Sequence, residues 1–199
     1  MNDALISRFI TARRKYIASE FSTLNPKQQE AVLTTEGPLL LLAGAGSGKT
    51  TVLINRVANL LRFGRGSDSY EVPNTVTEED VQFLEGVHEP LSDFDRHRAD
   101  HLCSVEPPEP WNVIAITFTN KAANELKERL VTMLGPKAQD VWAMTFHSAC
   151  CRILRRNIDL LGYSSSFTIY DAADSERQMK AVIKEMGLDD KTFPAKYVL

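Results

Sequence analysis

Three glycines, a lysine and a threonine stand close together early in the sequence, in the order Ala43-Gly44-Ala45-Gly46-Ser47-Gly48-Lys49-Thr50. Glycines let the backbone turn tightly, so that successive N–H groups can face the oxygens of a phosphate. Lys49 would bring an ammonium group to the β- and γ-phosphates, and Thr50 would offer a hydroxyl to Mg²⁺. The pattern predicts a binding site for a nucleoside triphosphate with Mg²⁺. The alternative is a glycine-rich turn that holds no ligand.

The segments on either side of this loop would position it. The apolar run over residues 38–43 predicts a buried strand, and residues 49–62 have the apolar spacing of a helix. A strand, a glycine-rich loop and a helix in this order form the setting of a phosphate-binding loop. The first turn of the helix would direct the positive end of its dipole toward the same anion. Ala43 stands where the strict pattern has glycine, at a position that requires only a small residue.

The rest of the sequence alternates between helical and strand patterns. Residues 1–23 are predicted as an amphipathic N-terminal helix, in which Arg13, Arg14 and Lys15 form a solvated basic face. Strands that alternate with helices predict an α/β fold, with a parallel sheet flanked by helices. Further helices are predicted over residues 26–33, 120–134, 147–161 and 171–186, and further strands over residues 112–118, 141–146 and 167–170.

Charge is distributed unevenly over the 199 residues, which carry a net charge of −3. Residues 64–110 hold 12 acidic and 3 basic residues, and they are rich in proline. We interpret them as an exposed acidic insertion with a short helix that starts at Thr77. The remaining residues hold 14 acidic and 20 basic residues. Such a basic remainder can bind the phosphates of a nucleic acid.

Composition also limits the class of protein. No apolar run reaches the roughly 18 residues of a membrane span, so no membrane partner is expected. The cysteines Cys103, Cys150 and Cys151 are an odd number with two adjacent, which is not the pattern of a disulfide framework. We therefore expect a reducing, cytoplasmic location.

Three further blocks follow the same order as in a known family: Leu24-Asn25-Pro26-Lys27-Gln28-Gln29-Glu30-Ala31-Val32, Thr117-Phe118-Thr119-Asn120-Lys121-Ala122-Ala123 and Thr145-Phe146-His147. With the glycine-rich loop, the chain resembles the N-terminal part of the UvrD/Rep/PcrA group of superfamily 1 DNA helicases. The resemblance covers about residues 24–62 and 111–190. It implies a RecA-like P-loop NTPase domain 1A, of which residues 24–149 are the first part with the insertion 64–110. Residues 150–199 would be the truncated start of a helical subdomain, 1B.

The resemblance implies a role for each matching residue. Gln28 would read the adenine of ATP through its amide, and Lys49 and Thr50 would be the catalytic positions, with Thr50 as Mg²⁺ ligand. Two motifs would bind single-stranded DNA by stacking bases on aromatic rings and holding phosphates. The residues implied are Gln28, Ala43, Gly44, Ala45, Gly46, Ser47, Gly48, Lys49, Thr50 and Thr51 for the nucleotide, and Phe118, Thr119, Asn120, Lys121, Thr145, Phe146 and His147 for DNA.

The sequence also departs from the family pattern. Thr51 stands where close relatives are expected to have arginine. The family's acidic Asp-Glu-x-Gln motif, its γ-phosphate-sensing arginines and its second motor domain do not occur in these 199 residues. The resemblance therefore implies the N-terminal part of an ATP-dependent helicase that moves 3′ to 5′ along single-stranded or partly duplex DNA. We expect this part to hydrolyse ATP negligibly and, because its sheet would be incomplete, to self-associate.

Several alternatives stay open at this point. Residues 167–171 resemble a Walker B strand that ends in an Mg²⁺-binding aspartate, although Asp171 also suits a helix N-cap. His97 and His101, with His88 and Cys103 nearby, could hold zinc. Arg152, Arg155 and Arg156 either extend the DNA track or form a solvated helix face. A P-loop kinase, a switch GTPase and a DNA-binding module without enzymatic activity are the rival classes.

Overall fold

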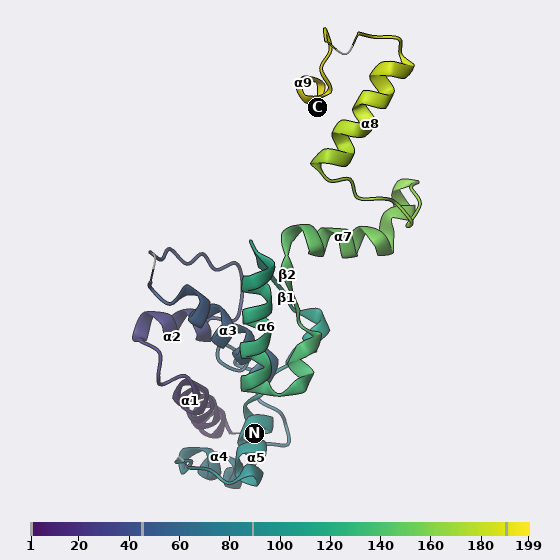
Figure 1. Cartoon of the computed structure of the whole chain (residues 1–199). Helices are drawn as coiled ribbons and strands as arrows, with labels where there is room; N and C mark the ends of the chain where they lie inside the picture. Colours follow the sequence, from purple (N-terminus) through teal and green to yellow (C-terminus); the bar gives the residue numbers. More distant parts are fainter. Residues whose placement is uncertain (1, 45, 89, 190) are drawn as a thin grey trace. The chain divides into compact units, whose positions relative to one another are not determined.

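Figure 1 shows the computed structural model of the chain, which describes residues 2–44, 46–88, 90–189 and 191–199. The chain divides into two compact units, Met1–Ala149 and Cys150–Leu199. The first unit contains α1 (Asp3–Glu20), α2 (Pro26–Leu33), α3 (Lys49–Phe63), α4 (Glu78–Glu85), α5 (Asp93–Cys103), the 3₁₀ turn η1 (Pro110–Asn112), β1 (Ile114–Thr117), α6 (Asn120–Leu134), the 3₁₀ turn η2 (Pro136–Asp140) and β2 (Trp142–Thr145). α7 (Phe146–Asn157) crosses the division, and η3 (Ile158–Leu161), α8 (Ala172–Glu185) and α9 (Ala195–Val198) belong to the second unit.

The ends of several helices follow from single residues that the sequence already indicated. Asn25, Thr77 and Asp171 each form a capping box at the start of α2, α4 and α8, in which a side-chain oxygen accepts a backbone N–H of the first turn. Gly135 ends α6 with a φ of 82°, which glycine adopts without steric cost. The predicted helix over residues 120–134 is confirmed with these bounds.

A small parallel sheet forms the centre of the part that follows residue 110. β1 and β2 pair in parallel, from Ile114 opposite Trp142 to Thr117 opposite Thr145. α6 connects the two strands and packs on both, and α3 packs against α6 (Figure 1). The core of this region contains Ile54, Val57, Ala115, Leu126, Leu130, Ala138 and Val141. The chain is thus a mixed, mostly helical protein with a two-stranded parallel sheet, which confirms the parallel arrangement of these strands.

Two predicted strands are not formed. The described residues of 38–43 pair with no other described strand, and Leu40 and Leu42 are 81% and 89% exposed. A strand is stabilised by the hydrogen bonds of a neighbour, and here β1 and β2 bond only to each other. Residues 167–170 are likewise irregular, with Ile169 exposed. The strand predicted over 112–118 is real but not buried, since Ala115 alone among its four β1 residues is buried.

The prediction of an exposed insertion over residues 64–110 is wrong. α4 and α5 pack against α1, and Val81, Leu84, Ala99 and Cys103 share a buried apolar cluster with Phe9 of α1 (Figure 1). The apolar residues of the segment recur at helical spacing and point into the core, while most of its acidic residues stay exposed. Burial in this cluster raises the pKa of the Cys103 thiol.

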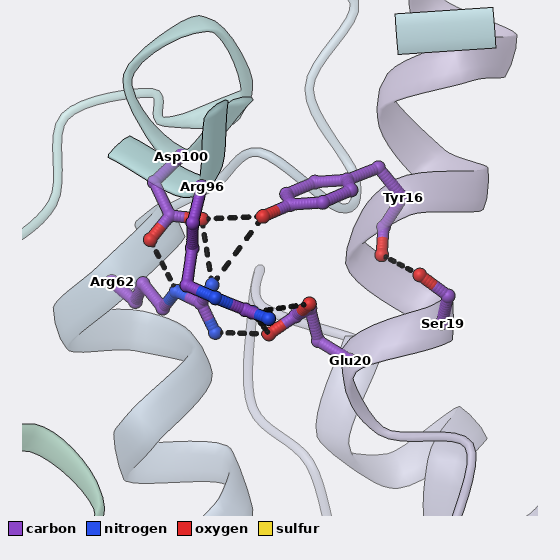
Figure 2. A network of polar contacts seen from close by, with 6 residues as sticks. All are labelled: Tyr16, Ser19, Glu20, Arg62, Arg96 and Asp100. Carbon is purple, nitrogen blue, oxygen red and sulfur yellow. Dashed lines mark hydrogen bonds and ion pairs between the residues drawn. The ribbon is translucent and has the colours of Figure 1, made fainter. Parts of the chain in front are cut away.

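A polar network joins α1, α3 and α5 (Figure 2). Arg62 of α3 donates to both carboxylate oxygens of Asp100 in α5, at 2.6 and 2.7 Å, and forms an ion pair with Glu20 of α1. The Tyr16 hydroxyl donates to Asp100 at 2.8 Å, and Arg96 contacts Glu20 at 3.1 Å. Burial lowers the pKa of Arg62, but its hydrogen bonds and ion pairs with the two carboxylates outweigh this and raise it above the ordinary value.

The arginines of α1 do not form the solvated face that was predicted. Arg13 is 0% exposed and donates to the backbone carbonyls of Ser69 and, at 2.7 Å, Glu71. Arg14 donates to two further carbonyls of residues 67–71, both at 3.1 Å. A guanidinium group has five N–H donors, so it can satisfy the carbonyls of an irregular loop that has no strand partner. Lys15 is exposed, as predicted.

Candidate nucleotide and nucleic-acid sites

The glycine-rich loop leads directly into α3. Gly48 is the N-cap with a φ of 82°, and Gly46 has a φ of 76°. The ammonium of Lys49 donates to the backbone carbonyls of Ala43 at 3.1 Å and Gly44 at 2.6 Å. The Lys49 side chain therefore lies over the glycine-rich loop, where its positive charge interacts with the negative ends of these two carbonyl dipoles.

Gln28 lies against this loop from α2. Its side-chain oxygen accepts the N–H of Asn25 at 3.2 Å, and its amide nitrogen donates to the carbonyl of Ser47 at 3.0 Å. A Cβ on Gly48 would come within 2.6 Å of that nitrogen. Position 48 favours glycine for its left-handed backbone, and a Cβ there would displace the end of the Gln28 side chain.

A cavity of about 690 Å³ adjoins the loop, and its lining includes Gln28, Ala43, Gly44, Ser47 and Lys49 of the residues predicted to bind nucleotide. Its walls combine apolar side chains of residues 39–42 with the polar groups of Gln28, Ser47 and Lys49. Thr50 and Thr51 lie in the first turn of α3 and are exposed. Ala45, also predicted to contact nucleotide, lies outside the described residues. The described residues of the predicted nucleotide set lie in the loop, in the first turn of α3 or, for Gln28, against the loop. The binding role of each residue stays a prediction.

The two motifs predicted to bind DNA follow neighbouring strands. Thr117, the last residue of β1, lies opposite Thr145, the last residue of β2. Because the strands are parallel, the residues that follow them lie at the same edge of the sheet. Phe118 is fully exposed after β1, and Phe146 is exposed after β2, at the start of α7.

The other residues of this edge divide into exposed groups and structural ones. Asn120, Lys121 and His147 are exposed, and the rings of His147 and Phe146 meet edge-on with centroids 6.3 Å apart. Thr119 and Thr145 accept backbone N–H groups three residues further on, so both hydroxyls help to begin helices. Sequence reasoning missed Ser148, whose hydroxyl lies 2.8 Å from that of Thr145, although its place three residues on was a capping signal.

Comparison with known families decides where this arrangement belongs. The sequence matches the family described as the UvrD/REP helicase N-terminal domain over residues 24–72 and 96–198. The chain belongs to this family. It is 44% identical over 185 residues to the ATP-dependent DNA helicase PcrA of Bacillus subtilis, which covers 92% of this chain and 19% of that relative. It is also 42% identical over 170 residues to PcrA of Staphylococcus aureus strain Mu50, and this alignment covers 85% of this chain and 18% of that relative.

The UvrD/REP family match does not cover the whole chain. The chain spans about a fifth of the length of these relatives. The match leaves out residues 73–95, which contain α4, and begins after α1. Residues 64–72 and 96–110 lie within it, so only the middle of the predicted insertion 64–110 departs from the family.

Two alternatives fare poorly against the geometry. Asp171 accepts the N–H of Asp174 at 2.7 Å as the N-cap of α8, and no strand precedes it, so a Walker B strand is not formed here. Cys103 is buried in the apolar cluster, and the described residues contain no group of three or more potential metal ligands. Within the same residues, no helix is long and apolar enough to cross a membrane.

Proposed function

We propose that this chain is the N-terminal ATP- and single-stranded-DNA-binding part of an ATP-dependent 3′–5′ DNA helicase. Residues 24–149 would be the first part of a RecA-like domain 1A, and residues 150–199 the start of a helical subdomain 1B. Support comes from family membership and from relatives named ATP-dependent DNA helicase PcrA. A cytoplasmic role in DNA repair is part of the same proposal and rests on the resemblance.

One observation carries the DNA-binding part of the proposal. Two exposed aromatic residues, Phe118 and Phe146, follow strands that end in register at Thr117 and Thr145. Exposed rings at one edge offer faces on which successive bases stack, and Lys121 next to them offers a cation for a phosphate. Phe118 is fully exposed and Phe146 is 61% exposed, so both rings are accessible to bases.

The residues of the loop also suit ATP and Mg²⁺. Gly48 begins α3 directly after the loop, and the Lys49 ammonium already lies over backbone carbonyls that a phosphate could replace as its partner. Thr50 would supply a hard oxygen ligand to Mg²⁺, which would offset charge on the phosphates when bound. Gln28 is bonded to Ser47 at the edge of the adjoining cavity, from where its amide would reach the adenine.

Hydrolysis needs more than this cradle. A γ-phosphate is attacked by a positioned water, with charges arranged around the transferred group. The 199 residues contain no Asp-Glu-x-Gln motif to orient that water. We propose that the chain binds nucleotide and turns it over negligibly, and that the helicase as a whole couples hydrolysis to motion along DNA. A guanine-specific switch is disfavoured, because Ala122 and Ala123 follow Asn120-Lys121 where a guanine-reading motif has aspartate at its end.

Fluorescence of a methylanthraniloyl-labelled ATP tests the nucleotide site. We expect binding that unlabelled ATP competes away and that Lys49→Ala abolishes or weakens at least tenfold. Lys180→Ala is the matched control, because Lys180 is an exposed lysine of α8 in the second unit. Equal binding by wild type and Lys49→Ala would show that the loop is not the nucleotide site. DNA-stimulated ATP hydrolysis by the 199-residue chain would contradict the proposal that this chain turns ATP over negligibly.

Self-association is the last part of the proposal. Ile114 and Ile116 of β1 and Leu40 and Leu42 of the unformed strand expose apolar side chains. Exposed apolar surface of this kind favours contacts between copies. Sedimentation velocity should show species larger than a monomer as concentration rises, and a single monomeric species throughout would contradict this.

A further inference from the structure

The connector between α2 and the glycine-rich loop is held by side chains from outside itself. A helix leaves its last carbonyl groups without intrahelical partners. At the end of α2, Arg56 of α3 donates to the carbonyls of Thr34 and, at 2.8 Å, Ala31. Asn59 of α3 donates to the carbonyl of Val32 at 2.9 Å. The helix that follows the loop therefore fixes the helix that precedes it.

Asp68 holds the N–H groups of the same connector. One of its carboxylate oxygens, Oδ2, accepts the N–H and, at 3.0 Å, the hydroxyl of Thr35. The same oxygen accepts the N–H of Glu36 at 3.3 Å. Two successive backbone amides thus point at one carboxylate, and such charge-assisted bonds are stronger than those between neutral groups.

Asp68 is itself fixed in place by α1. Arg14 donates to its backbone carbonyl at 3.1 Å, and the buried Arg13 donates to the carbonyls of Ser69 and Glu71. Burial lowers the pKa of Arg13, and its guanidinium nitrogens bond only to backbone carbonyls among the contacts described. Burying a guanidinium is costly unless it is hydrogen-bonded, and the loop accepts from both terminal nitrogens of Arg13, although its Nε has no partner among the described residues. α1 lies outside the family match, so this support is an addition to the matched region.

The position of the glycine-rich loop depends on these anchors. Residues 38–43, which lead to it, have no strand pairing to other described residues. A segment that lacks the hydrogen-bond ladder of a sheet is positioned by the contacts at its two ends. At the far end, Gln28 and Lys49 bond to the loop itself. At the near end, Asp68 holds residues 35 and 36.

We propose that Asp68 is a positioning residue for the phosphate-binding loop, acting through Thr35 and Glu36 to set the affinity of the chain for nucleoside triphosphate. This inference rests on the proposed nucleotide site. Without the carboxylate, Thr35 and Glu36 would lose the acceptor of their N–H groups, and the connector would adopt other conformations. The fraction of molecules with a competent loop would fall, and the apparent affinity would fall in proportion.

The test measures the dissociation constant of methylanthraniloyl-ATP and the melting temperature for Asp68→Ala and Asp68→Asn. We expect Asp68→Ala to bind about tenfold more weakly, which corresponds to a competent fraction of about one tenth. Asp68→Asn keeps the shape and one acceptor, so it should fall between Asp68→Ala and wild type. Asp189→Ala is the matched control, because Asp189 accepts the N–H groups of Lys191 and Thr192 in a similar turn of the second unit.

Two further readouts separate positioning from general stability. Hydrogen exchange at the amides of Thr35 and Glu36 should speed up in Asp68→Asn at a temperature where the chain stays folded. Should Asp68→Ala fail to fold, Asp68→Asn alone decides the question. Affinity within about twofold of wild type in the folded Asp68 variants, with a lower melting temperature only, would overturn the inference. Absence of nucleotide binding in wild type would instead overturn the proposed nucleotide site.

Discussion

Replacement of Arg62 by methionine should destabilise the first unit strongly, because it leaves two carboxylates without their shared cation. Arg62, Glu20 and Asp100 are 22%, 11% and 23% exposed, so water screens them only in part. Removing one partner of a buried ion pair costs about 3–5 kcal/mol. Arg96 still contacts Glu20 and the Tyr16 hydroxyl still donates to Asp100, so we take a loss of about 2–3 kcal/mol.

Urea unfolding followed by circular dichroism measures this loss, and a thermal scan checks it. For a chain of this size, each kcal/mol lowers the melting temperature by about 2–4 °C, so the shift should be about 4–12 °C. Arg8→Met is the matched control. Arg8 also contacts two carboxylates, Glu78 at 2.6 Å and Glu85 at 2.7 Å, but these pairs lie in solvent, and we expect no clear change.

A combined variant tests the reason for the loss. Adding Glu20→Gln and Asp100→Asn to Arg62→Met removes the stranded charges, so part of the lost stability should return. A loss below about 1 kcal/mol for Arg62→Met, or a further loss on adding the two amides, would refute the interpretation that buried charge governs this network.

Three other predictions address the packing and the edge that is proposed to bind DNA. Gly64→Ala should cost about 2 kcal/mol or more in urea unfolding, because a Cβ would lie 2.1 Å from the Val105 carbonyl oxygen at a φ of +56°; a change below about 0.5 kcal/mol would contradict this. The hydrogen bond from Arg98 holds the pKa of Asp80 below its ordinary value, so its stabilisation is present above about pH 4 and is lost as pH falls through the lowered pKa; Arg98→Gln should flatten the acid limb of the melting temperature, and an unchanged limb counts against the pair. Lys121→Ala should reduce the slope of log affinity for single-stranded DNA against log salt by about 0.7, whereas an unaltered slope would exclude a phosphate contact.

Local signals in the sequence predicted much of the fold. The caps Asn25, Thr77 and Asp171 and the helix stop at Gly135 depend on neighbours within a few residues, and all were found where expected. The two motifs predicted to bind DNA follow predicted strands that pair in parallel, which places both motifs at one edge of the sheet. Such features depend on bonds that form within one helix turn or one crossover.

Other features depend on partners that lie far along the chain. Residues 38–43 have the apolar composition of a strand, but strand formation needs a neighbour that no pattern in those residues supplies. The helical pattern predicted Arg13 as a surface residue, but its guanidinium lies over the ring of Phe9 and donates to carbonyls of the distant residues Ser69 and Glu71. For the same reason, Asp68 gave no indication from its sequence position that it holds Thr35 and Glu36.

Binding of a fluorescein-labelled oligothymidylate, followed by fluorescence anisotropy, tests the central claim that the edge beyond β1 and β2 binds single-stranded DNA. Base stacking on an aromatic ring contributes about 1–3 kcal/mol, so Phe118→Ala should weaken binding about tenfold or more. Phe94→Ala is the control, because Phe94 is also an exposed phenylalanine, lies on the acidic α5 and should leave binding unchanged. Wild-type affinity in Phe118→Ala, or equal losses in the two variants, would contradict the account.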